Sequence, residues 1–231
     1  VQITKLRFFI SLVVEQKVDE GKPNRGIQPL PNLETKFVAA NTLIGIARPQ
    51  QLTLRNPVID EKEKQLAEAR KRHFSARTHA TKAKYREQDK KLRRELADLL
   101  KKDGWGSETA QQLAGWDPYD QNAHAEFFDP EWMFGIKDGF DIVLGNPPYG
   151  AEYADADKKY FLQRYESIRT IRGVQKGSLD TFTLFIELGF NLLRKNGNLH
   201  FIVPISITSS DSMTSLHKLL EENCGMIKIS S

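Results

Sequence analysis

The sequence predicts an α/β fold: part of a Rossmann-like, doubly wound parallel sheet, interrupted by a long charged helical insertion. Two short apolar runs with β-branched members, 140–144 and 199–203, are typical of buried parallel strands. The amphipathic pattern between them predicts the helix that connects such strands. Upstream, a segment poor in apolar residues and rich in Glu, Lys and Arg predicts helices outside the sheet.

Composition limits the class of protein. The chain has 231 residues, 39% of them hydrophobic, which is enough for a core and excludes wholesale disorder. No run approaches the ~18 consecutive apolar residues of a membrane span, so we expect no membrane association. With one cysteine and five histidines that show no ligand spacing, we expect no internal disulfide, no metal and a cytoplasmic location.

The first 50 residues are expected to begin the sheet domain. Apolar residues at helical spacing over 3–18 predict a largely buried helix that ends near 19–21. A proline-rich turn follows, and 36–40 predicts a short strand that stops at Asn41.

Residues 51–130 are expected to be the insertion, between a first part at 1–50 and a catalytic part at 131–231. Within it, 59–102 predicts one long helix or a helical hairpin, and 103–130 an irregular or weakly helical segment.

The catalytic part is expected to follow the order strand, loop, helix, strand, helix, strand. Asp180 is expected to cap the first of these helices and Gly197 to end it. The expected ranges are strand 140–144, loop to 179, helix 181–195, strand 199–203, helix 211–222 and a strand from 226 to 229.

Positive charge is concentrated in one segment. The net charge is +4, yet 61–103 alone holds 15 Lys and Arg against 8 Asp and Glu. Such a segment is compatible with nucleic acid, and Arg70, Lys71 and Arg72 are natural candidates for contacts with DNA. A solvated helix face, a stiffener of the insertion or a contact with another domain are the alternatives.

The sharpest chemical signal is Asn146-Pro147-Pro148-Tyr149, at the carboxyl end of the strand over 140–144. Two prolines make a stiff turn that holds main-chain carbonyls outward, and the asparagine side chain adds another acceptor. These acceptors suit an exocyclic amine, and Tyr149 offers a flat face for a planar group. A plain turn followed by a core tyrosine is the alternative reading.

This loop resembles the catalytic signature of S-adenosylmethionine-dependent amino-methyltransferases, above all the DNA adenine-N6 methylases of large restriction–modification enzymes of type IIG. The resemblance implies the class I methyltransferase fold, here lacking its first strands. It extends to most of the chain, with 103–130 the weakest part. The matching segments are 3–12, 30–34, 70–74 onward, 140–149, 180–187 and 192–204.

The resemblance also implies roles. Asn146 and the main chain at Pro147 accept the hydrogens of the target amine, Pro148 stiffens the turn, and Tyr149 stacks on the flipped base. Asn41 occupies the position that contacts the adenine ring of S-adenosyl-L-methionine, and Asn146 is the second residue that the resemblance assigns to cofactor binding. An ordinary strand-end turn is the alternative for Asn41.

The glycine-rich cofactor loop and the ribose-binding acid of this family have no counterpart in the sequence. We therefore expect a fragment that neither binds the cofactor tightly nor methylates DNA alone. Its expected partners are double-stranded DNA and the remaining domains of a parent polypeptide: the cofactor loop, target recognition and possibly a nuclease.

Three other functions stay open at this stage. The same tetrapeptide serves enzymes that methylate a glutamine amide in release factors or adenine in RNA. A DNA-docking scaffold with a methylase fold and no activity is the third, because fold alone does not establish activity.

Overall fold

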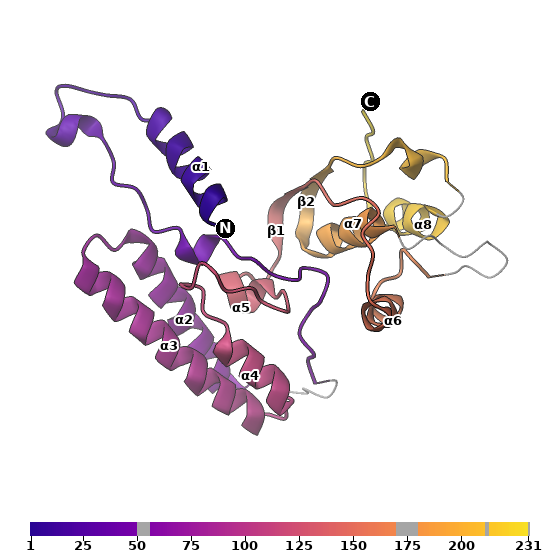
Figure 1. The fold of residues 1–231 in the computed structure, drawn as a ribbon, viewed down its shortest axis with the longest axis horizontal. Helices are drawn as coiled ribbons and strands as arrows, with labels where there is room; N and C mark the ends of the chain where they lie inside the picture. The colour runs from indigo at the N-terminus through magenta and orange to yellow at the C-terminus, as the bar shows by residue number, and fades with distance from the viewer. Residues whose placement is uncertain (50–55, 170–179, 211–212, 231) are drawn as a thin grey trace. The chain divides into compact units, whose positions relative to one another are not determined.

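The computed structural model describes residues 1–49, 56–169, 180–210 and 213–230. The chain is mixed α/β, mostly helical, with a two-stranded parallel sheet (Figure 1). It divides into two units, Val1–Ile136 and Lys137–Ser231, and each is described by itself. The expected boundary near residue 50 lies outside the described residues.

The first unit is built on a helical hairpin. Helices α2 and α3 lie side by side along their length, and α4 packs against α3 (Figure 1). Asn56 caps α2 by accepting from the Val58 amide, and Thr78 forms a reciprocal capping box with Thr81 at the start of α3. The elements are α1 (Gln2–Val14), η1 (Pro23–Gly26), η2 (Glu34–Lys36), α2 (Pro57–Ser75), α3 (His79–Lys102), α4 (Ser107–Gly115) and α5 (Pro130–Phe134).

One apolar core holds these helices together. Leu66 of α2, Leu96 of α3, Leu113 of α4 and Met133 of α5 are all buried in it. The apolar residues of the hairpin are sparse because they form only the inner stripe of each helix. The sequence predicted either one long helix or a helical hairpin over 59–102, and the structure shows the hairpin.

A buried ionic network crosses the same core. Asp89 is fully buried and accepts from Arg70 Nε and Arg93 Nε, each at 2.7 Å. Arg70 also donates to the carbonyls of Trp132 and Met133 at the end of α5. Arg93 donates to the carbonyls that end α4, at positions 114 and 116.

Three sequence expectations for this unit are wrong. Arg70 is 6% exposed and holds the core, so it is not available to DNA. Helix α1 forms, but none of its residues is buried: Phe8 meets the Phe37 ring edge-to-face and still stays 47% exposed. Residues 36–40 do not form a strand: only one parallel bridge joins Ala40 to Ala125.

In the second unit, β1 (Phe140–Gly145) and β2 (Leu193–Phe201) are parallel neighbours, as predicted, and α7 (Thr181–Asn191) connects them. Val143 pairs with Leu199 and Gly145 with Phe201. Gly189 of α7 comes so close to the sheet that a Cβ there would meet Leu199 Cδ1 at 2.7 Å. The other elements are α6 (Asp155–Arg164), η3 (Ile205–Thr208) and α8 (Thr214–Asn223).

Several details of this unit differ from the sequence prediction. Strand β1 is not covered on both faces: Ile142 and Leu144 are 57% and 73% exposed, because the two-stranded sheet has α7 on one side only. Helix α7 ends at Asn191, before Gly197, and Asp180 makes no side-chain cap. Helix α6 lies in the expected loop, and 226–229 are not in a strand. Residues 170–179 and 211–212, within the expected loop and last helix, are outside the described part.

The described residues contain neither a membrane-spanning helix nor a cluster of metal ligands. No helix among them is both long and apolar enough to span a membrane. No group of three or more His, Cys, Asp or Glu side chains in the same residues is placed to hold a metal ion.

Replacing Asp89 by alanine should destabilise the first unit strongly. The change leaves two buried guanidinium groups without their shared carboxylate, and breaking such a pair costs about 3–5 kcal/mol. Urea denaturation followed by circular dichroism measures the loss. The control is Asp98→Ala, on the exposed side of the same helix, which should change the unfolding free energy by less than about 0.5 kcal/mol. Equal effects of the two changes would contradict the role of Asp89.

Gly139→Ala should destabilise the second unit by about 1–3 kcal/mol. Gly139 has φ +87°, and a Cβ there would meet the Arg194 amide nitrogen at 2.5 Å. A rise in exchange of the β1 and β2 amides, measured by NMR, reports the change. Gly225→Ala is the matched control, since nothing lies within 4 Å of its added Cβ. Unchanged exchange in Gly139→Ala would show that the backbone at this position can relax.

Candidate active site

The predicted catalytic loop follows the carboxyl end of β1, the edge at which open α/β sheets bind ligands. Asn146 comes directly after Gly145, whose carbonyl accepts from the Ile202 amide at 3.1 Å. This bond continues the pairing of the two strands by one residue past the end of β2. The loop therefore begins from a fixed point of the sheet.

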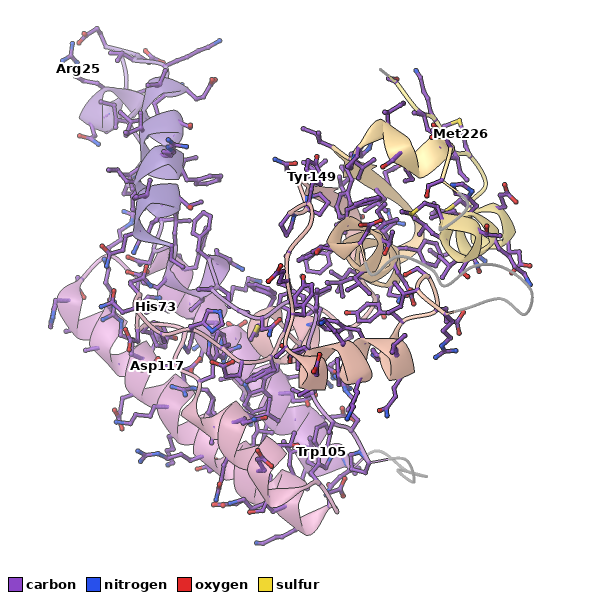
Figure 2. All side chains as sticks on the ribbon, turned by 45° about the vertical axis from the view of Figure 1, so that its right-hand side comes forward. Arg25, His73, Trp105, Asp117, Tyr149 and Met226 are labelled. Carbon is purple, nitrogen blue, oxygen red and sulfur yellow. The ribbon has the colours of Figure 1, made fainter. Side chains whose placement is uncertain are left out.

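Tyr149 is anchored at both ends of its side chain. Its hydroxyl donates to the Ile202 carbonyl at 2.9 Å, and its ring meets Phe182 edge-to-face at 6.4 Å between centroids. The residue is nevertheless 51% exposed; Figure 2 labels it on the loop that follows β1. Part of the ring is therefore held in place and open to solvent.

The four motif residues divide into inward and outward positions. Pro147 is buried, whereas Asn146, Pro148 and Tyr149 are exposed. The Asn146 carboxamide oxygen lies 3.3 Å from the Tyr149 hydroxyl. The structure therefore brings a carboxamide and an aromatic ring together on one exposed loop, with a buried proline below them.

The start of α7 holds the far end of this loop. Thr181 is fully buried, and its hydroxyl oxygen accepts from the Ala151 amide at 3.1 Å. Together with the ring contact of Phe182, this bond fixes the loop on both sides of Gly150. Sequence reasoning missed Thr181, because a threonine in the first turn of a helix is ordinary.

A buried carboxylate fixes the segment after α6. Glu187 is 3% exposed and accepts from the amides of Glu166 at 2.9 Å and Ser167 at 2.7 Å. The sequence carried a signal for it, an acid within the apolar run of the helix at 181–195. Its role is to hold backbone, since its carboxylate oxygens are engaged by main-chain donors.

One ion pair lies at the opposite end of β1. Arg194 Nε donates to the Asp141 carboxylate at 2.6 Å, and this hydrogen bond lowers the pKa of Asp141. Both side chains are exposed, so the pair contributes little to stability.

Asn41, the other predicted cofactor residue, belongs to the first unit. It follows the bridge between Ala40 and Ala125 and is half-buried; its main-chain amide donates to the Ala125 carbonyl at 2.8 Å. Asn41 and Asn146 lie in separate units, each described by itself, so their joint use stays a prediction.

The second unit has the order strand, Asn-Pro-Pro-Tyr loop, helix and parallel strand. A comparison with protein families agrees with the methylase resemblance of this order. A model of the Eco57I restriction-modification methylases matches residues 1–231, the whole chain. The chain belongs to that family. This match confirms the resemblance seen in the sequence to the methylases of restriction–modification systems.

Individual relatives match shorter stretches. A type II methyltransferase of Thermus thermophilus is 33% identical over 107 residues, 39% of this chain. A type II restriction enzyme and methyltransferase of Escherichia coli is 33% identical over 93 residues, 40% of this chain. The matches span only 24% and 9% of those two proteins. No solved structure matches significantly.

Thr181→Val should free the end of the Asn-Pro-Pro-Tyr loop. The change keeps the volume of the side chain and removes the acceptor of the Ala151 amide, a bond worth about 1 kcal/mol. We expect that amide to exchange with solvent roughly fivefold to tenfold faster by NMR. Thr181→Ser keeps the hydroxyl and should leave the exchange near the wild-type rate. Equal exchange in the valine variant would mean that Thr181 does not hold the loop.

Proposed function

We propose that this chain carries the catalytic loop of an enzyme that methylates adenine N6 in DNA, using S-adenosyl-L-methionine, within a restriction–modification system. The observation that carries the proposal is the pairing of the Asn146 carboxamide with the half-exposed ring of Tyr149 at the carboxyl end of β1. Membership of the methylase family supports it.

The loop offers acceptors without a base. The Asn146 oxygen and the main-chain carbonyl at Pro147 would each accept one hydrogen of the amine, which directs the nitrogen lone pair elsewhere. The Tyr149 hydroxyl makes its shorter bond to Ile202, 2.9 Å against 3.3 Å to Asn146. The asparagine oxygen therefore keeps acceptor capacity for a substrate.

Adenine N6 is poorly reachable inside a duplex, so the base must be flipped out. Tyr149 suits the reception of a flipped base, because its ring is exposed while its hydroxyl and its edge are held by Ile202 and Phe182. A ring fixed before binding loses little entropy when a base stacks on it.

The cofactor site fits in part. Asn41 and Asn146 carry carboxamides, which can pair with the polar edge of an adenine ring or with an amine. Among the described residues we assign no further side chains to the methionine part of the cofactor. When bound, S-adenosyl-L-methionine supplies the methyl group on a positively charged sulfur. This chain's part is to position the accepting amine.

The relatives indicate the setting. The Escherichia coli relative joins a restriction enzyme to a methyltransferase, and the matched stretch is a small part of it. We propose that this chain likewise acts with further domains that complete cofactor binding and target recognition, and that it does not methylate DNA alone.

Asn146→Ala should abolish methyl transfer in a polypeptide that includes this chain and its neighbouring domains. Removing one of the two acceptors of the amine should lower the transfer rate by about 100-fold or more, because orientation supplies much of the rate. The measurement uses methyl-labelled S-adenosyl-L-methionine with unmethylated DNA and identifies the product by mass spectrometry.

The matched control is Asn122→Ala, an exposed asparagine of the first unit, which should retain the wild-type rate. RNA and release-factor protein are offered in parallel. Label in either of these would keep the mechanism and overturn the DNA substrate. A folded protein that labels nothing would overturn the enzyme and favour a scaffold.

A further inference from the structure

The positive charge of the helical hairpin resides on α3. This helix has nine Lys and Arg and four Asp and Glu, whereas α2 has five and four. The acids of α3 are partly used: Asp89 is buried between two arginines, and Glu95 pairs with Lys62 and Lys91. A surplus of cations remains on the exposed side of α3.

Four of these cations share one side of the helix. Arg86, Lys90 and Arg94 follow one another at intervals of four residues, and Lys101 lies two turns further. All four are exposed. We call Arg86, Lys90, Arg94 and Lys101 the α3 stripe. It extends about 22 Å along the helix axis, at 1.5 Å per residue.

Internal partners do not neutralise the stripe. Lys90, Arg94 and Lys101 have no carboxylate within 4.0 Å in the described residues, and only Arg86 is paired, with Glu34 at 3.6 Å. Like charges at a spacing of four residues destabilise a helix by roughly 0.2–0.5 kcal/mol per pair. A face that served stability alone would alternate its charges, so the stripe favours an external anion.

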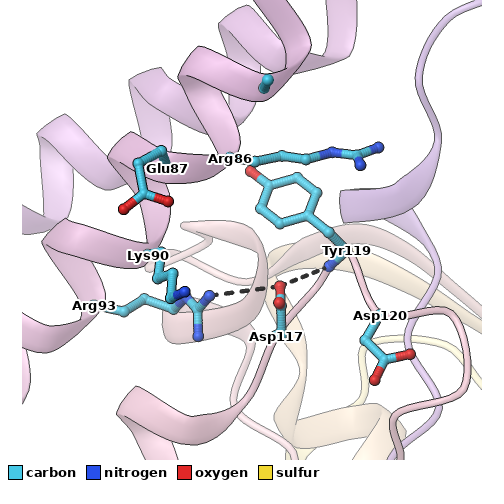
Figure 3. Close-up of a pocket in the computed structure, with 8 residues that line it drawn as sticks. Arg86, Glu87, Lys90, Arg93, Asp117, Tyr119 and Asp120 are labelled. Carbon is cyan, nitrogen blue, oxygen red and sulfur yellow. Dashed lines mark hydrogen bonds and ion pairs between the residues drawn. The ribbon is translucent and has the colours of Figure 1, made fainter. Parts of the chain in front are cut away.

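The helix that carries the stripe is rigidly held. Arg93, one position before Arg94, is clamped by the buried Asp89, and Figure 3 shows it beside Asp117, to which it lies within 3.5 Å. Arg86 extends along the Tyr119 ring, 5.3 Å from its centroid. The pocket of about 420 Å³ beside Arg86 and Lys90 has equal numbers of acids and cations, so it is not itself an anion site.

The Asn-Pro-Pro-Tyr loop itself offers no cation to phosphate. Residues 145–157 contain Glu152, Asp155 and Asp157 and no Lys or Arg; Lys158 and Lys159 follow in α6, where Lys158 pairs with Asp155 at 3.3 Å. We therefore expect the phosphate contacts on another surface. We propose that the α3 stripe binds the phosphodiester backbone of double-stranded DNA without reading its sequence. This inference rests on the proposed DNA substrate and assigns the surface that holds it.

The test measures duplex binding by the 231-residue chain, using fluorescence anisotropy over a range of salt concentrations. The variant Lys90→Gln, Arg94→Gln, Lys101→Gln should bind at least tenfold more weakly at low salt. Its salt slope, log K against log [salt], should fall by roughly 2–3, because each phosphate contact contributes about 0.9. The three side chains are exposed, so the unfolding midpoint should not change.

The matched control, Lys64→Gln, Lys71→Gln, Arg77→Gln, removes the same charge from exposed positions off α3. It should keep the wild-type salt slope and bind within about twofold of the wild type. Equal losses of DNA affinity in the two variants would overturn the stripe, because they would show that binding depends on the net charge of the chain alone. No binding by the wild type, or tighter binding of polyglutamate than of DNA, would also overturn it.

The two proposals fail separately. If methyl transfer depends on Asn146 but the stripe variant keeps the wild-type salt slope, only the proposed DNA surface is overturned. A stripe that binds DNA, in a protein that labels RNA or release factor and not DNA, would overturn the proposed substrate.

Discussion

The first unit depends on one buried carboxylate. Asp89 receives Arg70 from α2 and Arg93 from its own helix, and the same two guanidinium groups reach the carbonyls that end α5 and α4. Buried cations are costly unless they are paired, and here both guanidinium groups share the one carboxylate. The apolar core packs the four helices, and the Asp89 network links α2 and α3 to each other and to the ends of α5 and α4.

Buried polar side chains also fix the backbone around the candidate site in the second unit. Glu187 holds two main-chain amides after α6, and Thr181 holds one after the Asn-Pro-Pro-Tyr loop. Both residues stand on α7, which also packs on β2. One helix thus packs on the sheet and, through buried polar groups, fixes the Asn-Pro-Pro-Tyr loop and the segment after α6. This explains how a loop with three exposed residues keeps a defined geometry.

Periodicity predicted the helical hairpin, α7 and the two parallel strands, because local apolar spacing decides them, but it missed α5 and α6. It failed where burial depends on distant partners. The spacing of α1 predicted a buried face, and Leu144 belonged to a run expected to be covered on both sides, yet neither is buried. Arg70 was the reverse case: a lone sequence shows a charge, and only the fold shows Asp89 beside it. Asn146 and Tyr149 stand out in the sequence through their motif and stay predictions as site residues, whereas the contact of Thr181 with the loop required the structure.

Recognition and chemistry place opposite demands on a protein that modifies DNA. Phosphate contacts hold and position the duplex, and contacts with the base decide the reaction. The loop over 146–149 is uncharged and offers hydrogen-bond acceptors, which suits an orienting site and gives phosphate no cation to bind. The stripe on α3 has the complementary character: rigid, cationic and without a set of groups for a base edge. In the proposed function the α3 stripe makes the phosphate contacts and leaves the Asn146 oxygen and the Tyr149 ring to the base, so an uncharged loop would suffice for a polyanionic substrate.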